Sequence, residues 1–511
     1  MSHPSDPIKV YDARWEVHEF SDDQVRRLFQ ATLAYGRLLG VDTVTITRDA
    51  RLGAGRVMQL AVEVALGMGL RVFLRAEPIS TPQGYFTSLY VSQQYPRTMG
   101  LGITASHNPA QYIGVKFTVP PVQAIGYDCG PLGGLTKIRE IYHSAEQFPA
   151  RGGGSLELLD LTRQYIDFSL AAAGVRDGDL SGLAVVLDAF NGSAGPEMFM
   201  ALRRAGVRVE AIRLIPDGNF PTGSPNPTSQ GKMNAAVTLA AERNCDAVIG
   251  IDGDGDRIVF GDRKGILTAG FAFIPILEAC LQPSASHSQI ENRKSKIPSP
   301  PPVLYDPKVT PLALAEWGRL GARPILFRNG HSQIKDYMTR IGALAAAEES
   351  GHYYHRISMG ELTISGENSI LTVLLFLRAL KRHPGLMQRL WSLQERVFTT
   401  GEFNYQFDSD ATRDRAMAAV IEHFVREGAA TVTATPDGID LQGTCLSRGV
   451  RLDPGSVALD DGWYSGYLRI ATNEKAVVRS YFSAGDTASG SRVEGEARRI
   501  LGEQFGGRVI D

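Results

Sequence analysis

Three acidic residues at alternate positions are the clearest candidates for chemistry in this chain. The segment IDGDGDR places Asp252, Asp254 and Asp256 directly after the apolar run DAVIG. Three carboxylates this close repel one another unless a cation lies between them, and the intervening glycines let the backbone curl so that the side chains converge. Hard oxygen ligands suit Mg²⁺, and ligands of α/β proteins bind at the carboxyl ends of strands. The segment therefore predicts a magnesium site more strongly than a solvated acidic turn.

Two other metal-dependent functions could use the same acids. An EF-hand loop needs glycine at position six and glutamate at position twelve, but this chain has Arg257 and Arg263 there. A metal-dependent aspartyl phosphatase would use Asp252 as its nucleophile, in a motif resembling D-x-D-x-[TV]; Asp256 occupies the fifth position instead. The phosphatase hypothesis stays open, although it leaves the serine segment described next without a role.

A second candidate segment, GITASHNPAQYIGVKF, contains Ser106, His107 and Lys116. A serine nucleophile needs activation, and His107 is too close in sequence to be assumed its base, so the pair alone is also consistent with a turn-capping serine. A phosphorylated serine carries about −1.5 to −2 charge, which a metal site opposite it could offset. Lys116 could neutralise developing charge or transfer protons.

Strand and helix patterns alternate along most of the chain. Residues 42–49 read as a buried strand, followed by a helical pattern and a second strand, which is a βαβ unit. The pattern recurs twice before about residue 390, which predicts α/β units with mixed, mostly parallel sheets. The C-terminal part reads as strands around one helix, a smaller α+β domain. Residues 282–302 are rich in Ser, Pro and charge, which predicts a surface loop.

Composition excludes several classes of partner. The chain has 511 residues with 53 Lys and Arg against 55 Asp and Glu, so its net charge of −2 offers no general attraction to nucleic acid or membrane. No apolar run is long enough for a transmembrane helix, and the N-terminus lacks the apolar core of a signal peptide. The four cysteines have no C-x-x-C spacing, which favours a reducing compartment. We therefore expect a cytoplasmic protein, as a monomer or dimer.

The two segments TASHNPAQYIGVK and DGDGDR, in this order, resemble the α-D-phosphohexomutases, the phosphomannomutase/phosphoglucomutase group. The resemblance implies a phosphoserine at Ser106, which would also ligate Mg²⁺ together with Asp252, Asp254 and Asp256. It implies four domains, which we expect at 1–152 with the phosphoserine loop, 153–262 with the metal loop, 263–394 with a sugar-recognition loop, and 395–511 with a phosphate-binding loop.

Further segments extend this resemblance to the substrate site. AEESGHYYH resembles the family's sugar-recognition loop, with Ala347 in place of a usual glycine, while YDARWEV resembles the family's N-terminal entry segment, with Trp15 in place of glycine. RNGHSQIK resembles the stretch before the sugar loop and adds Lys335 as a candidate. The substrate-binding and catalytic residues implied here are Arg14, His107, Lys116, Arg257, Lys308, His331, Glu348, Ser350 and His352.

A second G-E-x-S segment, SGENSI, could be confused with the sugar loop. It opens the apolar run ILTVLLFLRAL and lacks the following Gly-His. We interpret it as a helix N-terminus capped by Ser365 or Asn368.

The fourth-domain phosphate loop is altered. The family motif R-x-S-N-T-E-P corresponds to RIATNEKAVVR, in which Arg469, Thr472 and Asn473 remain as donors for phosphate. Ala471 replaces the serine and Lys475 the proline, while Arg479 is a further candidate. The resemblance thus predicts a mutase that interconverts hexose 6-phosphate and hexose 1-phosphate through a hexose 1,6-bisphosphate, with mannose phosphate preferred and glucose phosphate also possible. The altered loop keeps open a second hypothesis, a sugar-phosphate-binding protein with weakened catalysis.

Overall fold

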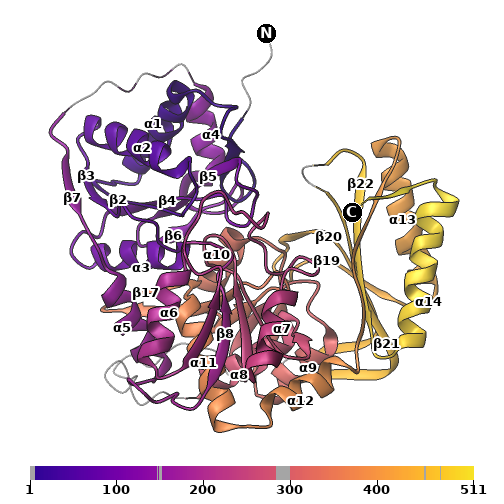
Figure 1. Ribbon diagram of the computed structural model, residues 1–511. Coiled ribbons are helices and arrows are strands. Elements are labelled where there is room, and N and C mark those ends of the chain that lie inside the picture. Colours follow the sequence, from indigo (N-terminus) through magenta and orange to yellow (C-terminus); the bar gives the residue numbers. More distant parts are fainter. Residues whose placement is uncertain are drawn as a thin grey trace.

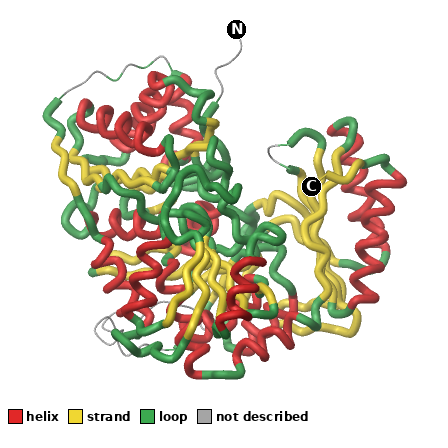
Figure 2. Tube along the Cα trace, in the orientation of Figure 1, coloured by secondary structure: helices red, strands yellow, loops and turns green. Residues whose placement is uncertain are grey.

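The computed structural model describes residues 6–144, 146, 148, 152–282, 300–453, 456–471 and 474–510. Four sheets follow one another along the chain, and each carries its own helices (Figure 1). The first and fourth sheets lie on opposite sides of the molecule, and the second and third lie between and below them (Figures 1 and 2). This arrangement agrees with three α/β units followed by a smaller α+β domain.

The first sheet has the strand order β1-β5-β4-β2-β3-β7, with β6 paired to β5. Strands β4, β2, β3 and β7 run parallel; β5 is antiparallel to β4, and β1 is antiparallel to β5 at the edge of the sheet. Helices α1, α2 and α4 lie over one face and α3 over the other (Figure 1). The elements are β1 (Ala13–Glu16), α1 (Asp22–Leu38), β2 (Thr43–Arg48), α2 (Ala54–Gly67), β3 (Arg71–Leu74), α3 (Thr81–Ser92), β4 (Thr98–Ile103), β5 (Tyr112–Val119), β6 (Gln123–Ala124), α4 (Leu135–His143) and β7 (Ser155–Leu158).

Strand β7 pairs with β3, so the first sheet extends past the boundary expected at residue 152. Trp15, which replaces a usual glycine, does not distort the backbone. It is 4% exposed in the regular strand β1 and packs against Phe20 with ring centroids 5.6 Å apart.

The second sheet has the order β12-β11-β10-β8-β9, in which β8, β9 and β10 are parallel. Every residue of β8 and β10 is buried, as expected for central parallel strands. The elements are α5 (Thr162–Ala173), β8 (Ala184–Asp188), α6 (Gly195–Arg204), β9 (Arg208–Ile212), α7 (Asn234–Arg243), β10 (Ala247–Ile251), β11 (Ile258–Asp262) and β12 (Gly265–Ile266).

The third sheet has the order β14-β13-β15-β16-β17, with the first three strands parallel and the last two forming an antiparallel hairpin. Its buried residues share one continuous core with those of the second sheet, so these two domains pack as one body. The elements are α8 (Ala269–Leu281), β13 (Pro302–Tyr305), α9 (Pro311–Arg319), β14 (Arg323–Leu326), α10 (His331–Ile341), β15 (Ala345–Ala347), β16 (Tyr353–Met359), β17 (Leu362–Glu367), α11 (Ser369–Arg382) and α12 (Leu386–Gln394).

The fourth sheet is antiparallel around β20, β21 and β22, with the order β19-β20-β21-β22-β18-β23. The expectation of one helix in this domain is wrong, because α13 and α14 both pack against the sheet. The helical pattern of α14 is weak in the sequence because the helix contains two glycines, Gly490 and Gly495, and few apolar residues. The elements are β18 (Phe398–Gln406), α13 (Asp410–Arg426), β19 (Ala430–Ala434), β20 (Asp440–Asp453), β21 (Ser456–Ile470), β22 (Val477–Ala484), α14 (Thr487–Arg498) and β23 (Arg508–Ile510).

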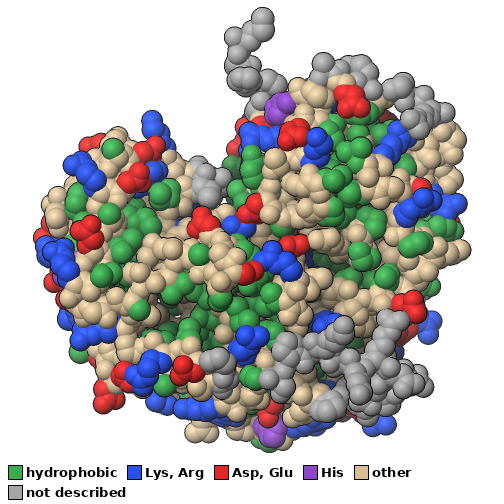
Figure 3. All heavy atoms as spheres, turned by 180° about the vertical axis from the view of Figure 1, so that it is seen from behind, with side chains coloured by type: hydrophobic (Ala, Val, Ile, Leu, Met, Phe, Trp, Pro, Cys, Tyr) green, Lys and Arg blue, Asp and Glu red, His purple; other side chains and the backbone are tan. Residues whose placement is uncertain are grey.

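Seen from behind, the surface is indented between the lobe formed by the first domain and the lobe formed by the fourth (Figure 3). Lys, Arg, Asp and Glu side chains are interspersed over this face, in keeping with the small net charge. In the described part of the chain, no helix combines the length and the apolar character needed to cross a membrane.

Candidate active site

Ser106 lies in the loop between β4 and β5, at the carboxyl end of the first sheet's strands. Its side chain is 2% exposed, and its φ of 52° lies in the left-handed region that a residue with a side chain rarely adopts. The surrounding loop holds this conformation: the Ser106 amide donates to Thr104 Oγ1 at 2.8 Å, and Thr104 in turn donates to Asp49 Oδ2 at 2.7 Å. Backbone strain of this kind gathers at functional sites.

Arg51 fixes the same loop from beneath. Its guanidinium is 1% exposed, pairs with Asp49 at 3.1 Å, and donates to the carbonyls of Ser106 and Asn108 at 2.6 Å and of Pro109 at 2.7 Å. Sequence reasoning missed this residue. The signal for it, an arginine flanked by Asp49 and a glycine-rich helix start, has no distinctive spacing.

The acidic segment follows β10 directly, at the carboxyl end of the second sheet's strands. Asp252, Asp254 and Asp256 are each no more than 2% exposed, and one ligand oxygen from each lies within 4.8 Å of the others. Glycine is required between them, because a Cβ on Gly253 would lie 2.8 Å from the Ser106 carbonyl and Gly255 has a φ of +78°. The glycines thus permit the close approach of the two loops.

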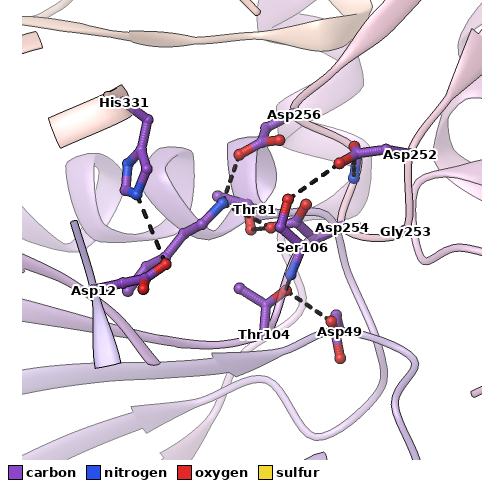
Figure 4. A network of polar contacts seen from close by, with 12 residues as sticks. Asp12, Asp49, Thr81, Thr104, Ser106, Asp252, Gly253, Asp254, Asp256 and His331 are labelled. Carbon is purple, nitrogen blue, oxygen red and sulfur yellow. Dashed lines mark hydrogen bonds and ion pairs between the residues drawn. The ribbon is translucent and has the colours of Figure 1, made fainter. Parts of the chain in front are cut away.

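The two loops meet through Ser106 and Asp252. Ser106 Oγ donates to Asp252 Oδ2 at 3.2 Å and also lies 3.2 Å from His107 Nδ1 (Figure 4). The sequence prediction that the serine faces the acidic segment therefore has direct geometric support.

The acidic cluster fits a bound divalent cation. Asp254 Oδ1 is buried with no hydrogen-bond partner among the described residues, whereas Asp254 Oδ2 accepts from Thr81 at 2.6 Å. Burial and the two neighbouring carboxylates raise the pKa of Asp252 to about 8. Such a carboxylate needs a further positive charge to remain ionised. Hard oxygen atoms around this position, including the Ser106 hydroxyl, are the donor set that Mg²⁺ prefers.

Lys116, on β5, is the protein's own cation in this cluster. Its Nζ lies 2.8 Å from Asp254 Oδ2 and 2.5 Å from Asp256 Oδ2, and the residue is 3% exposed. Burial disfavours the charge, but the two carboxylates outweigh it and raise the pKa of Lys116 well above its ordinary value. Lys116 therefore stays protonated as long as the carboxylates of Asp254 and Asp256 lie beside it.

His107 and Arg14 lie beside the serine. Burial and the nearby guanidinium groups of Arg257 and Arg14 lower the pKa of His107 well below its ordinary value, so its imidazole is neutral near pH 7. Arg14 donates to Asn108 Oδ1 at 3.1 Å and pairs with Asp12 at 2.8 Å. Arg14 thus reaches the serine loop, as the resemblance implied.

The sugar-loop residues approach the acidic segment from the third domain. The backbone of His352 forms a β-bridge with Arg257, and the Ile258 amide donates to the Gly351 carbonyl at 2.8 Å. His352 Nε2 lies 3.3 Å from Asp256 Oδ1. Burial opposes protonation of His352, but Asp256 outweighs it and raises the imidazole pKa.

Glu348 and Ser350 lie next to this histidine. Ser350 Oγ is 2.8 Å from His352 Nδ1 and 3.3 Å from Glu348 Oε2. Glu348 Oε1 accepts from Tyr354 Oη at 2.6 Å. The carboxylate is thus held in one orientation with its second oxygen toward Asn329 and Ser350.

His331 and Lys308 have different neighbours. His331 begins α10, lies 4.0 Å from Asp12, and has neither ring nitrogen hydrogen-bonded among the described residues (Figure 4). Burial and the charges of Lys335 and Lys116 lower its pKa well below the ordinary value. Lys308 points instead toward the fourth domain, where its Nζ lies 3.4 Å from Glu402 Oε2.

The phosphate-loop region brings together cations around one carboxylate. Arg469 on β21 is opposite Arg479 on β22, and Arg479 pairs with Glu402 at 2.7 Å and with Glu474 at 2.8 Å. Thr472 and Asn473 lie outside the described residues. Lys475 is exposed in the turn that follows them.

Three comparisons with known proteins identify the class. Family models described as phosphoglucomutase/phosphomannomutase, alpha/beta/alpha domains I, II and III, match residues 7–126, 163–265 and 288–398, in chain order. A phosphomannomutase from Salmonella typhimurium (strain LT2) is 30% identical over 367 residues, which cover 68% of this chain and 72% of that protein. A protein named phosphohexose mutases from Xanthomonas campestris pv. campestris (strain B100) is 27% identical over 423 residues, 82% and 86% of the two chains.

Solved structures show the same fold. A phosphoglucomutase/phosphomannomutase family protein from Burkholderia thailandensis superposes with a TM-score of 0.75 at 23% identity, covering 98% of both chains. The open form of the phosphoglucomutase pp63/parafusin from Paramecium gives a TM-score of 0.74 at 16% identity, covering 99% of this chain and 96% of that one.

The class of protein is thus an intramolecular phosphotransferase that acts on hexose phosphates. The chain belongs to the phosphoglucomutase/phosphomannomutase family. This membership favours a phosphohexomutase over the phosphatase and the binding protein that the sequence left open.

Proposed function

We propose that the chain interconverts hexose 6-phosphate and hexose 1-phosphate through a phosphoserine at Ser106, with mannose phosphate as the preferred substrate and glucose phosphate as a second one. The observation that carries the mechanism is the contact between Ser106 Oγ and Asp252 Oδ2 at 3.2 Å, which joins the serine loop to the acidic cluster. The preference for mannose follows the named phosphomannomutase relatives.

The proposed cycle is balanced in its bonds. The phosphorylated Ser106 passes its phosphoryl group to the free sugar hydroxyl, which forms an O–P bond as the serine O–P bond breaks and gives a hexose 1,6-bisphosphate. The bisphosphate then reverses its orientation in the site and transfers its other phosphoryl group to Ser106. A sugar hydroxyl loses its proton in the first half and an alkoxide regains one in the second, so the net reaction consumes nothing.

Residues near the serine can move these protons and balance the charge. Lys116 contacts Asp254 and Asp256. His331 is neutral, and neither of its ring nitrogens has a hydrogen-bond partner among the residues that the structure describes, so His331 can accept a hydroxyl proton. Arg14 and Arg257 add positive charge near the phosphoryl oxygens. Asp252, Asp254, Asp256 and the Ser106 oxygen would hold Mg²⁺, which supplies Lewis-acid neutralisation of phosphoryl charge when bound.

The remaining residues would bind the substrate. Glu348, Ser350 and His352 offer acceptors and donors for sugar hydroxyls. Lys308, Arg469 and Arg479 would hold the non-reacting phosphate, because arginine binds phosphate through two parallel hydrogen bonds. Thr472 and Asn473 remain candidates from the sequence alone.

Mass spectrometry and one substitution test the mechanism. We expect phosphate on Ser106 of the purified protein, and Ser106→Ala to reduce turnover by roughly three or more orders of magnitude because the phosphoryl carrier is gone. Ser181→Ala is the matched control, since Ser181 is at the surface of the second domain and donates to the Gly178 carbonyl at 2.6 Å. Turnover of Ser106→Ala at the control's level would refute the phosphoserine mechanism. A coupled assay with mannose, glucose and glucosamine phosphates tests the substrate preference.

A further inference from the structure

The segment SGENSI, interpreted from sequence as a helix start, lies against the acidic cluster. Asn368 is the N-cap of α11, with its side chain accepting from the Leu371 amide at 3.0 Å, so that part of the interpretation is confirmed. Ser365 is not a cap, because it belongs to β17 and its Oγ lies 2.9 Å from Thr339 Oγ1 at the surface. The residues at the junction of β17 and α11, Glu367, Asn368 and Ser369, are each 2% exposed.

Ser369 contacts the metal loop itself. Its Oγ donates a hydrogen bond to the carbonyl of Gly255, which lies between two of the three clustered acids. Gly255 has no room for a side chain, since a Cβ there would lie 2.5 Å from Ala194 and 2.9 Å from Ser80. The serine hydroxyl therefore fixes one peptide of the loop from the third domain.

Asn368 ties the same segment to the second domain. Its Oδ1 accepts from Tyr165 Oη and from Ser169 Oγ, both at 3.1 Å and both on α5. The segment thus cannot move independently of the domain that carries the acids.

Glu367 places a fourth carboxylate at the edge of the cluster. One of its oxygens lies within 4.8 Å of a ligand atom of Asp256 and of a ring nitrogen of His352. Lys335 Nζ lies 3.0 and 3.3 Å from the two oxygens of Glu367, donates to Tyr85 Oη at 3.1 Å, and stands 4.2 Å from the Tyr85 ring centroid. The pair therefore joins the third domain to α3 of the first.

The charges explain why this pair is present. Lys335 and Lys116 are both 3% exposed and lie close enough to disfavour each other's charge. Without Glu367, Lys335 would be an uncompensated buried cation competing for Asp256. Because Lys335 is paired with Glu367, Asp256 interacts with Lys116 and His352 and not with Lys335.

We infer that Glu367, Asn368 and Ser369 form a positioning element of the mutase site, in which Ser369 fixes the metal loop through Gly255 and Glu367 holds Lys335 away from Asp256 and His352. This rests on the proposed function, since it assigns the acidic cluster to the metal. Groups behind metal ligands commonly change affinity or activity by about 10- to 100-fold when they are removed.

Metal binding by the full-length, EDTA-stripped protein tests the serine contact. Titration calorimetry with Mg²⁺ alone should show at least about tenfold weaker binding for Ser369→Ala than for the wild type. Ser365→Ala, the same substitution four residues earlier in the segment, should bind Mg²⁺ as the wild type does. Equal affinities of Ser369→Ala and Ser365→Ala would overturn this part of the inference. If the wild type itself binds no Mg²⁺, the proposed metal site fails first.

Kinetics test Glu367. We expect Glu367→Gln to lower kcat at least about tenfold while KM changes much less, because the displaced lysine disturbs the reacting groups more than the sugar contacts. The double variant Glu367→Gln/Lys335→Met removes the displaced lysine together with its partner and should regain most of the kcat lost in Glu367→Gln, because no unpaired cation is left to compete for Asp256. A double variant as slow as Glu367→Gln would mean that the lysine is not what disturbs the site and would overturn the inference, as would wild-type kcat in Glu367→Gln.

Discussion

The carboxylates of the metal loop differ in their hydrogen-bond partners, although they alternate regularly in sequence. Asp252 accepts from the Gly255 and Arg257 amides at 3.1 Å, whereas Asp256 is held by Lys116 and His352. Asp254 Oδ1 and Asp256 Oδ1 are both buried without a hydrogen-bond partner among the described residues, but Asp256 Oδ1 lies 3.3 Å from His352 Nε2. The three carboxylates are therefore unequal, and Asp254 has most to gain from a cation.

Asp254→Asn should accordingly weaken Mg²⁺ binding at least about tenfold and lower turnover, since one full negative charge leaves the cluster. Calorimetry of the stripped protein and activity at graded Mg²⁺ concentrations measure the two effects. Asp262→Asn is the control, because Asp262 ends β11 on the same hairpin and binds Trp391 instead. Full activity of the wild type in excess EDTA would contradict the proposal that the acidic loop binds a catalytically required Mg²⁺.

Among the elements, the start of α3 is joined to α6 by a buried carboxyl group. Ser80, the N-cap of α3, donates to Glu197 near the start of α6, and the next residue, Thr81, donates to Asp254. Burial raises the pKa of Glu197 from 4.5 to about 8. The folded protein thus keeps a proton on Glu197 at neutral pH, close behind the metal loop.

The sign of the resulting pH dependence follows from linkage. Between about pH 4.5 and 8 the folded state binds a proton that the unfolded state has released, so this group's contribution to the free energy of unfolding falls as pH rises through that window. Glu197→Gln keeps the shape without the charge. The difference between its melting temperature and that of the wild type should therefore grow in favour of the variant from about pH 4.5 to pH 8 and level off at higher pH. Glu210→Gln, on the partly exposed strand β9, should show no such trend, and a parallel pair of curves for Glu197→Gln and wild type would contradict the raised pKa.

The elements that could be predicted from sequence were those whose signal is local. The apolar run of β10 followed by acids was enough to predict where the metal loop lies. A buried parallel strand and its carboxyl end can be recognised from a few consecutive residues. Thr81, Arg51 and Glu367 could not be found this way, since each acts through a partner more than thirty residues distant. The segment SGENSI shows the difference: its cap was predictable, but its contact with Gly255 depends on how two domains pack.

Across the whole molecule, the third domain contacts both the first and the fourth domain. Arg328, two residues after the end of β14, pairs with Asp128 of the first domain and donates to the Asp440 carbonyl of the fourth at 3.1 Å. Tyr337 on α10 donates to Asp437 of the fourth domain at 2.9 Å. The fourth domain therefore approaches the site along α10 and the sugar loop, which brings its arginines toward Lys308.

Glu402 occupies the meeting point of these cations. Its carboxylate binds Arg479 of its own domain and Lys308 of the third, and burial is outweighed by Lys308, Arg469 and Arg479, so that its pKa is lowered. An ionised carboxylate among three cations competes with a phosphate dianion for the same partners. Two features would thus weaken phosphate binding by the altered loop. Glu402 competes with the phosphate for the same cations, and Ala471 lacks the hydroxyl donor of the serine that it replaces.

Glu402→Gln should therefore strengthen the binding of the non-reacting phosphate by Lys308, Arg469 and Arg479. We expect KM for the hexose phosphate to fall several-fold with little change in kcat, because one repelling charge is removed while the arginines remain. The gain should shrink as salt is raised, since these groups are partly exposed. Glu474→Gln is the matched control: Glu474 pairs with Arg479 at 2.8 Å but not with Lys308, so its effect on KM should be smaller. Steady-state kinetics at two salt concentrations measure all three proteins. A higher KM in Glu402→Gln would show that the carboxylate aligns Lys308 and Arg479 for phosphate instead of competing with it, and that the fourth domain needs this ion pair to reach the substrate.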